Sequence, residues 1–227
     1  MKSLLDLDFT PFLISFKLAL VTTVILFFVA LPLAWWLSQT KSRVKPFIEA
    51  ISSMPIVLPP SVLGFYLLVA FSKNSPIGEF LSHFNIELLF SFSGLVVASV
   101  IYSFPFMLQP LQSGFESLNK GMIEQSFLAN KGVVTTLFRV ALPNIKPALI
   151  TALIITFAHT IGEFGVVLMV GGSIPEQTKV ASVAIYEMVE IMDYKSAHIY
   201  SAIMLLISFS VLLIVYILNR KFKLKAL

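Results

Sequence analysis

The sequence predicts an all-α, polytopic membrane protein with about five transmembrane helices, and three observations predict this fold class. Of the 227 residues, 57% are hydrophobic and only 12% are charged, with a mean hydropathy of +0.91, whereas a soluble domain needs more polar surface. The apolar residues gather in runs of about 20 residues or more, enough to cross a hydrocarbon core. These runs lack the alternation of apolar and polar residues that is typical of β-barrel strands.

The first run, residues 12–37, lies near the N-terminus and could be taken for a signal peptide. It is longer than the apolar core of a signal peptide, about 7 to 15 residues, and no small-x-small cleavage site follows it. We therefore expect residues 12–37 to form a retained first transmembrane helix.

The second and third runs, residues 51–71 and 90–111, contain prolines within the expected spans. Pro59 and Pro60 remove backbone donors and kink a helix, which lipid tolerates only where neighbouring helices or a wet cavity satisfy the freed carbonyl groups. Such breaks often line a transport pathway, and a kink that serves packing alone is equally consistent with the pattern. Pro105 in the third run has the same two interpretations.

Residues 117–147, between the third and fourth runs, are charged and helix-patterned, unlike the apolar runs around them. Asn130 or Gly132 can adopt the left-handed backbone that ends a first short helix, and Pro143 and Pro147 are expected to end a second. The apolar positions of the two helices are Met122, Ile123, Ser126 and Phe127, then Val133, Val134, Leu137, Phe138 and Ala141. Such a pair suits insertion into a groove on a partner, and it equally suits an interfacial helix pair resting on lipid headgroups.

The fourth run, residues 148–170, holds Glu163, the only carboxylate inside an expected span. A charge within the membrane costs about 2.5 kcal/mol or more at the bilayer centre, so Glu163 is a functional candidate. His159 lies four residues earlier, on the same helical face. A shared metal ion or a proton relay is conceivable, and a His–Glu hydrogen bond that helps both groups tolerate burial is the simpler interpretation.

The fifth run, residues 199–218, follows a segment that contains Glu187, Glu190 and Asp193. These acidic residues could dock an extracytoplasmic protein, or they could belong to a solvated loop. Residues 181–192 are apolar enough for a short helix. Residues 175–195, which include this stretch, are a possible sixth, partial membrane segment.

The charges predict the orientation of the chain. Eleven of the 16 Lys and Arg residues lie after the first, third and fifth runs, whereas the opposite side has five basic and eight acidic residues. The positive-inside bias places the N-terminus outside and the C-terminus in the cytoplasm. The basic residues flank spans without aromatic stacking partners, which favours lipid headgroups over nucleic acid. The absence of cysteine excludes disulfides and thiolate metal sites.

The charged segment resembles the coupling motif of ABC-transporter permeases, in which Glu-Ala-Ala precedes a Gly and, further on, Ile, one residue and Leu-Pro. Here the motif reads Glu124-Gln125-Ser126 at one end and Val140-x-Leu142-Pro143 at the other, at the same separation. The motif's Gly falls on Asn130, with Gly132 two residues later. The resemblance implies an interface with a cytoplasmic ATPase subunit that includes Glu124, Gln125, Ser126, Asn130, Gly132, Leu142 and Pro143.

Three further stretches, residues 54–68, 103–118 and 161–172, resemble the permease subunits of molybdate and tungstate importers. The likeness covers nearly the whole chain, which predicts a single transmembrane domain over residues 1–227. Sulfate permeases share the layout and are the main alternative. The sequence Gly-Glu-Phe-Gly at 162–165 favours molybdate, because sulfate permeases tend to have Tyr at the Phe position.

The resemblance implies a set of partners and a pathway through the cytoplasmic (inner) membrane. The partners would be a second copy of the chain, two ATP-binding subunits and an extracytoplasmic oxyanion-binding protein. The chain itself would be no enzyme and would bind no cofactor or metal. ATP and magnesium would belong to the ATPase, because the chain lacks a G-x-x-x-x-G-K-[ST] loop. Candidate pathway or gate residues are Pro59, Pro60, Ser61, Pro105, Gly162, Glu163, Phe164 and Gly165.

A bare carboxylate facing the route of a dianion would repel it. We therefore expect Glu163 to be protonated, or hydrogen-bonded to a neighbouring helix, and to fix the gate rather than bind substrate. A hypothesis from another class is an intramembrane enzyme or proton-coupled carrier that uses His159 and Glu163 and needs no ATPase.

Overall fold

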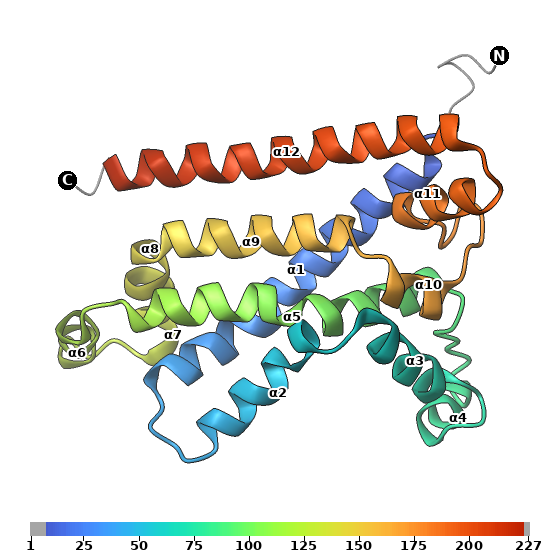
Figure 1. Cartoon of the computed structure of the whole chain (residues 1–227). Helices are drawn as coiled ribbons and strands as arrows, with labels where there is room; N and C mark the ends of the chain where they lie inside the picture. Colours follow the sequence, from blue (N-terminus) through green and yellow to red (C-terminus); the bar gives the residue numbers. More distant parts are fainter. Residues whose placement is uncertain (1–7, 225–227) are drawn as a thin grey trace.

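The computed structural model describes residues 8–224, and all regular structure among them is helical (Figure 1). In chain order the elements are α1 (Thr10–Gln39), α2 (Lys45–Val57), α3 (Pro60–Phe71), α4 (Pro76–Ser82), α5 (Phe92–Glu116), α6 (Lys120–Leu128), α7 (Val133–Thr136), the π-helix η2 (Leu137–Ala141), α8 (Leu142–Asn144), α9 (Lys146–Ile161), α10 (Gly165–Gly171), α11 (Ala181–Glu190) and α12 (Tyr194–Leu224).

The centre of the fold is the pair formed by α1 and α5, which make the most extensive helix contact in the molecule. Ala19, Ala30 and Ala34 of α1 are fully buried, and small residues of this kind let two helix backbones approach closely in a membrane protein. The ring of Trp35 packs edge-on against Phe115, with centroids 5.1 Å apart. The α1–α5 pair is thus the rigid support for the other helices.

The second expected span is broken. Helices α2 and α3 meet at an angle of 109°, and Leu58 and Pro59 between them are extended, with ψ of 134° and 135°. Each of these residues precedes a proline, whose ring disfavours helical geometry at the preceding residue. Pro105 behaves differently: it is buried inside α5, which continues through it to Glu116.

The fourth expected span is interrupted too. Helix α9 ends at Ile161, and α10 begins only at Gly165. A segment with a Gly on each side of Glu163 and Phe164 is prone to leave helical geometry, because Gly costs helix stability. Non-helical backbone at membrane depth needs protein or water to satisfy its polar groups, so the contacts of this break are of particular interest.

Three helices, α1, α5 and residues Tyr194–Ile217 of α12, are long and apolar enough to span a membrane by themselves. Two bent pairs raise the number of spans to five: α2 with α3, and Val133–Asn144 with α9, the latter bent by 84°. The described residues thus hold three to five candidate spans, and the expected total of about five is the upper end of this range. The possible sixth segment is α11, whose ten residues extend for about 15 Å and cannot cross a bilayer alone.

The charged segment folds partly as expected. Asn130 takes the left-handed backbone with φ of 55°, while Gly132 is the N-cap of α7 with φ of −69°. The expectation that Pro143 ends the second helix is wrong, since helical geometry runs from Val133 through η2 to Asn144. Pro143 lies in the three-residue α8, directly after η2 and next to the last residue of this helical run.

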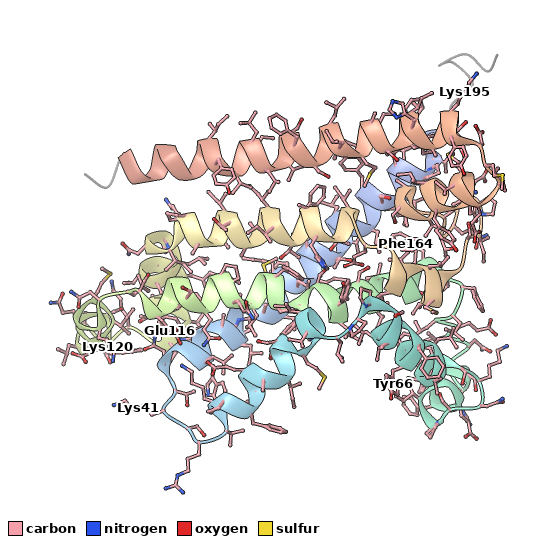
Figure 2. The ribbon with its side chains drawn as sticks, viewed as in Figure 1. Lys41, Tyr66, Glu116, Lys120, Phe164 and Lys195 are labelled. Carbon is pink, nitrogen blue, oxygen red and sulfur yellow. The ribbon has the colours of Figure 1, made fainter. Side chains whose placement is uncertain are left out.

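Figure 1 shows which connections and short helices lie at each of the two ends of the molecule. The α1–α2 connection, α6 to α8 and the C-terminal end of α12 lie at one end, and α4, α10 and α11 lie at the other with the start of α1. In Figure 2, Lys41 and Lys120 are at the first end and Lys195 is at the second. The segments that the charge pattern assigns to one side of the membrane therefore share one end of the fold.

Candidate functional site

The two interrupted spans meet at an open cavity of about 580 Å³. The start of α3 forms one wall, and the break between α9 and α10, where Figure 2 labels Phe164, forms another. The lining residues are Pro60, Ser61, Tyr102, Ala158, His159, Gly162, Glu163, Phe164 and Gly165. Six of the eight predicted pathway residues therefore lie together, although they come from distant parts of the chain.

The two remaining candidates do not line this cavity. Pro59 is the exposed N-cap of α3, next to the cavity residue Pro60. Pro105 lies buried in α5, and its helix is unbroken at that point. Sequence reasoning also missed three polar residues of α5, namely Ser99, Tyr102 and Ser103. The sequence contains a pattern that could have identified two of them: Ser99 and Ser103 are four residues apart in an apolar helix and so share one face.

Glu163 is 3% exposed, and its carboxylate is bound by α5. Ser99 Oγ donates to Oε2 at 2.5 Å, and Ser103 Oγ donates to Oε1. The expected hydrogen bonds to a neighbouring helix are thus present. A buried carboxylate needs such donors, because desolvation of an unpaired charge is expensive. The Glu163 side chain has no exposed surface. It is part of the cavity wall, but its carboxylate is therefore not open to the cavity.

The backbone of the break is satisfied from another helix. Ser182 Oγ of α11 donates to the main-chain carbonyl of Glu163 at 2.5 Å, and Phe164 packs on Tyr186 of α11 with ring centroids 5.1 Å apart. The break is therefore held by α5 through a side chain and by α11 through the main chain. The main-chain carbonyl of Glu163 thus has the hydrogen-bond partner that non-helical backbone needs within the membrane.

His159 is linked to Glu163 through Ser103. Its Nδ1 atom lies 2.9 Å from Ser103 Oγ and 3.4 Å from Glu163 Oε1, so the direct His–Glu hydrogen bond expected from the spacing is replaced by a shared serine. The imidazole stacks on Phe106 at 3.9 Å and packs against Tyr102 at 4.9 Å. These contacts fix the plane of the ring.

Two glycines allow α3 and α10 to pack tightly beside the cavity. A Cβ atom at Gly64 would lie 2.8 Å from Met169 Cβ, and one at Gly165 would lie 3.0 Å from Pro60 Cβ. Real Cβ atoms hardly ever come as close as the first of these contacts, and the second is tighter than most, so a side chain at Gly64 would force a shift and one at Gly165 would need Pro60 to give by a few tenths of an ångström. Helices α3 and α10 are therefore closely packed beside the cavity.

Outside the cavity, Glu187 of α11 forms an ion pair with Lys179, which lies just before the helix. Burial raises the pKa of the Glu187 carboxyl, but the hydrogen bonds from Lys179 and Ser173, with the positive charge of Lys179, outweigh it, and the pKa lies below its usual value. Among residues 8–224 no group of three or more His, Asp and Glu side chains could hold a metal ion.

The second predicted site, the charged segment, forms a projecting tip. Ser126 and Thr136 share a buried hydrogen bond of 2.8 Å that joins α6 to α7, which explains why Ser126 is 5% exposed. Glu124, Gln125, Asn130, Gly132 and Pro143 are exposed, and Leu142 is half-buried. The apolar residues divide as well: Leu137 and Ala141 are buried, whereas other apolar side chains face outward.

The outward apolar side chains of this tip form what we term the tip surface: Phe127, Leu128, Val133, Val134 and Phe138. Their exposed fractions reach 86% at Leu128 and 69% at Val134. Exposed apolar patches rimmed by charge mark interaction sites. The tip surface is the second candidate site.

Comparison with known proteins agrees with this architecture. The chain is 47% identical over 217 residues to the molybdenum transport system permease protein ModB of Azotobacter vinelandii, covering 95% of this chain and 96% of the relative. It is 33% identical over 206 residues to a probable sulfate transport system permease protein cysT of Helicosporidium sp. subsp. Simulium jonesii, covering 91% and 76%.

A similar fold occurs in the crystal structure of a bacterial alginate ABC transporter in complex with an alginate pentasaccharide-bound periplasmic protein. The TM-score is 0.72 at 17% identity, covering 96% of this chain and 81% of that chain. The family model "binding-protein-dependent transport system inner membrane component" matches residues 30–224. The chain therefore belongs to the family of binding-protein-dependent transport system inner membrane components.

Proposed function

We propose that this chain is the permease subunit of an ATP-driven importer that carries molybdate, and tungstate with it, across the cytoplasmic membrane. The observation that carries the proposal is the 47% identity to a molybdenum transport permease over almost the full length of both chains. The cavity at the two helix breaks is the part of the structure that suits a polar route through the membrane, because broken helices leave backbone donors and acceptors there.

Sulfate is the second candidate substrate, and a specific observation favours it. A sulfate permease relative is 33% identical over 91% of this chain, and sulfate and molybdate are both tetrahedral dianions. The difference between the two identities, 47% against 33%, makes molybdate the first choice.

The tip surface is the proposed contact with a cytoplasmic ATPase subunit. It combines exposed apolar side chains with the exposed charges of Glu124 and Arg139, a composition that suits insertion into a groove. The ATPase would bind ATP and magnesium. Two such subunits would serve two copies of the permease, because one chain has too few spans to enclose a polar route.

The charge bias orients the tip surface toward the cytoplasm. Helix α11 then lies at the outer end, where an extracytoplasmic binding protein would deliver the anion. Under this orientation the N-terminus is outside and the C-terminus is inside.

Transport would follow from movement of the helices around the cavity. Closure of the ATPase dimer would draw the two tip surfaces together, and the α9–α10 break would act as a hinge. Glu163, bound to α5 and α11, would fix the resting position of this gate. It would not contact the anion.

The experiment is uptake of labelled molybdate into cells that contain or lack this chain, with tungstate or sulfate in excess. Uptake that requires the chain and ATP, and that tungstate but not sulfate reduces, supports the proposal. Equal competition by sulfate would move the assignment to the second candidate. Uptake driven by a pH gradient without ATP would support a proton-coupled carrier based on His159 and Glu163.

A further inference from the structure

We propose that His159 is a substrate-contacting residue, which donates a hydrogen bond from Nε2 to the oxyanion in the cavity. This inference rests on the proposed function and assigns a role in that function to a residue of the cavity wall. It follows from the direction of the imidazole ring and from the positions that protons can occupy between His159 and Glu163.

The direction of the ring is set by its contacts. Nδ1 is turned toward Ser103 and Glu163, and the ring faces are covered by Tyr102 and Phe106. Nε2 lies on the opposite edge of an imidazole from these partners, and within residues 8–224 it makes no hydrogen bond. The side chain is 20% exposed and lines the cavity, so its free edge faces the open space.

The proton positions follow from the hydrogen bonds. Ser103 has one hydroxyl proton and lies between Glu163 Oε1 and His159 Nδ1. Its Oγ also lies 2.9 Å from Thr160 Oγ1, which donates its own proton to the Thr156 carbonyl. In one arrangement Glu163 is ionised, Ser103 donates to it, and Nδ1 of a protonated His159 donates to Ser103. In the other, neutral Glu163 donates to Ser103, and Ser103 donates to Nδ1 of a neutral His159.

Both arrangements have zero net charge and contain the same number of protons. Both also place a proton on Nε2, because Nδ1 either carries a proton alongside Nε2 or accepts one from Ser103. A neutral network is the state that burial favours, since an uncompensated charge within the membrane is costly. In a third neutral arrangement the Glu163 proton goes to Ser99 Oγ and neutral His159 donates from Nδ1 to Ser103, which leaves Nε2 without a proton. We assign one of the first two arrangements, in which the imidazole presents an N–H donor to the cavity.

The remaining polar groups of the cavity suit the same ligand. The hydroxyls of Ser61 and Tyr102 line it, and neither side chain forms a hydrogen bond within the described part of the chain. Besides His159, Tyr102 and Glu163 are the titratable side chains in the cavity wall, and Glu163 is shielded by Ser99 and Ser103. A tetrahedral oxyanion would meet hydroxyl and imidazole donors and no exposed carboxylate.

Three substitutions separate the donor from the structural contact. His159→Gln keeps an amide N–H near the position of Nε2. His159→Asn keeps one near Nδ1, where it can still reach Ser103, but it presents no donor to the cavity. His83→Asn is the matched control, because His83 is exposed at the end of α4, bonded to the carbonyl of Glu79.

The measurement is made on the whole complex of permease, ATPase and binding protein in proteoliposomes, with labelled molybdate at the outer face. We expect His159→Asn to lower uptake by roughly tenfold to a hundredfold, the range for loss of one hydrogen bond to a charged group. ATP hydrolysis stimulated by the loaded binding protein should persist, so that fewer anions cross per ATP. His159→Gln should retain uptake within about threefold.

Several outcomes would overturn the inference. One is equal uptake by His159→Asn and His83→Asn in complexes recovered in equal amount. Another is an equal loss for His159→Asn and His159→Gln together with poor recovery of both complexes, which indicates a structural role only. If the unsubstituted complex carries no molybdate, tungstate or sulfate, the proposed function itself fails, and that result is distinct from either of the others.

Discussion

At the scale of single residues, the carboxylate of Glu163 is the most demanding group in the molecule. Its burial is tolerated because Ser99 and Ser103 bind its two oxygens. Loss of one partner would leave buried polar atoms unsatisfied, at a cost of about 1–3 kcal/mol each. The stability of the fold around Glu163 therefore depends less on the negative charge of its carboxylate than on the hydrogen bonds that the side chain forms.

This reasoning predicts opposite results for two substitutions of Glu163. Glu163→Gln should fold and transport within about threefold of the unsubstituted chain, because the amide still fills the site and still accepts from one serine. Glu163→Ala should unfold at a lower temperature and be recovered in smaller amount, since it removes the carboxylate that accepts from Ser99 and from Ser103. Thermal unfolding in detergent measures both.

Glu79→Ala is the control, because Glu79 is an exposed carboxylate of α4. Loss of uptake in well-folded Glu163→Gln would contradict this interpretation and would assign a role to the negative charge.

At the scale of helices, α3 and α10 pack through glycine. The 2.8 Å approach that a Cβ atom at Gly64 would make to Met169 Cβ means that any side chain must push the two helices apart. Overpacking of this kind typically costs about 1–3 kcal/mol. The packing also determines the width of the cavity, because Pro60 and Gly165 lie at the ends of the same two helices.

Gly64→Ala should therefore lower the unfolding temperature of the purified permease. Gly132→Ala provides a matched comparison, since a Cβ atom there meets nothing within 4 Å and its backbone is not left-handed. Equal unfolding temperatures for the two variants would show that α3 and α10 separate freely.

The tip surface gives a second prediction at this scale. Leu128→Glu places a charge on the most exposed apolar side chain of the tip, at 86% exposure. If the tip inserts into a groove of the ATPase, desolvation of this charge should weaken binding by at least about tenfold. Co-purification of the ATPase with tagged permease measures the loss.

Ile191→Glu is the comparison for the tip, because Ile191 is also apolar and 73% exposed but lies beyond α11, at the other end of the fold. Retention of the ATPase by Leu128→Glu would place the contact elsewhere.

At the scale of the whole molecule, the fold separates two ends that differ in charge. The chain contains no cysteine, so single cysteines can report orientation without background. Lys131→Cys should react with a membrane-impermeant maleimide only after cells are permeabilised, whereas Asn74→Cys should react in intact cells. Both side chains are exposed. The reverse pattern of labelling would invert the orientation inferred from the positive-inside bias.

Much of the fold follows from the sequence alone, because hydrophobic length and charge bias act locally. Runs of apolar residues locate α1, α5 and α12. They give the ends of α1 to within two residues, whereas α5 and α12 continue by about five residues into polar sequence. The Pro-Pro pair predicts the break before α3. The left-handed turn at Asn130 follows from the tolerance of Asn for that geometry. Glu163 could be recognised as a candidate from the sequence, because a carboxylate within the membrane is unfavourable unless other groups form hydrogen bonds to it.

Tertiary structure decided what these local features do together. Only packing of α5 against α9 shows that Ser99 and Ser103 are the partners of Glu163, and that Ser103 stands between Glu163 and His159. Only the approach of α3 to α10 brings Pro60 and Ser61 to Gly162 and Gly165. The sequence by itself determines where a helix must break and where a charge must be buried, because both follow from the residues at that position. It does not determine which distant side chains form hydrogen bonds to these groups, because that depends on how the helices pack against one another.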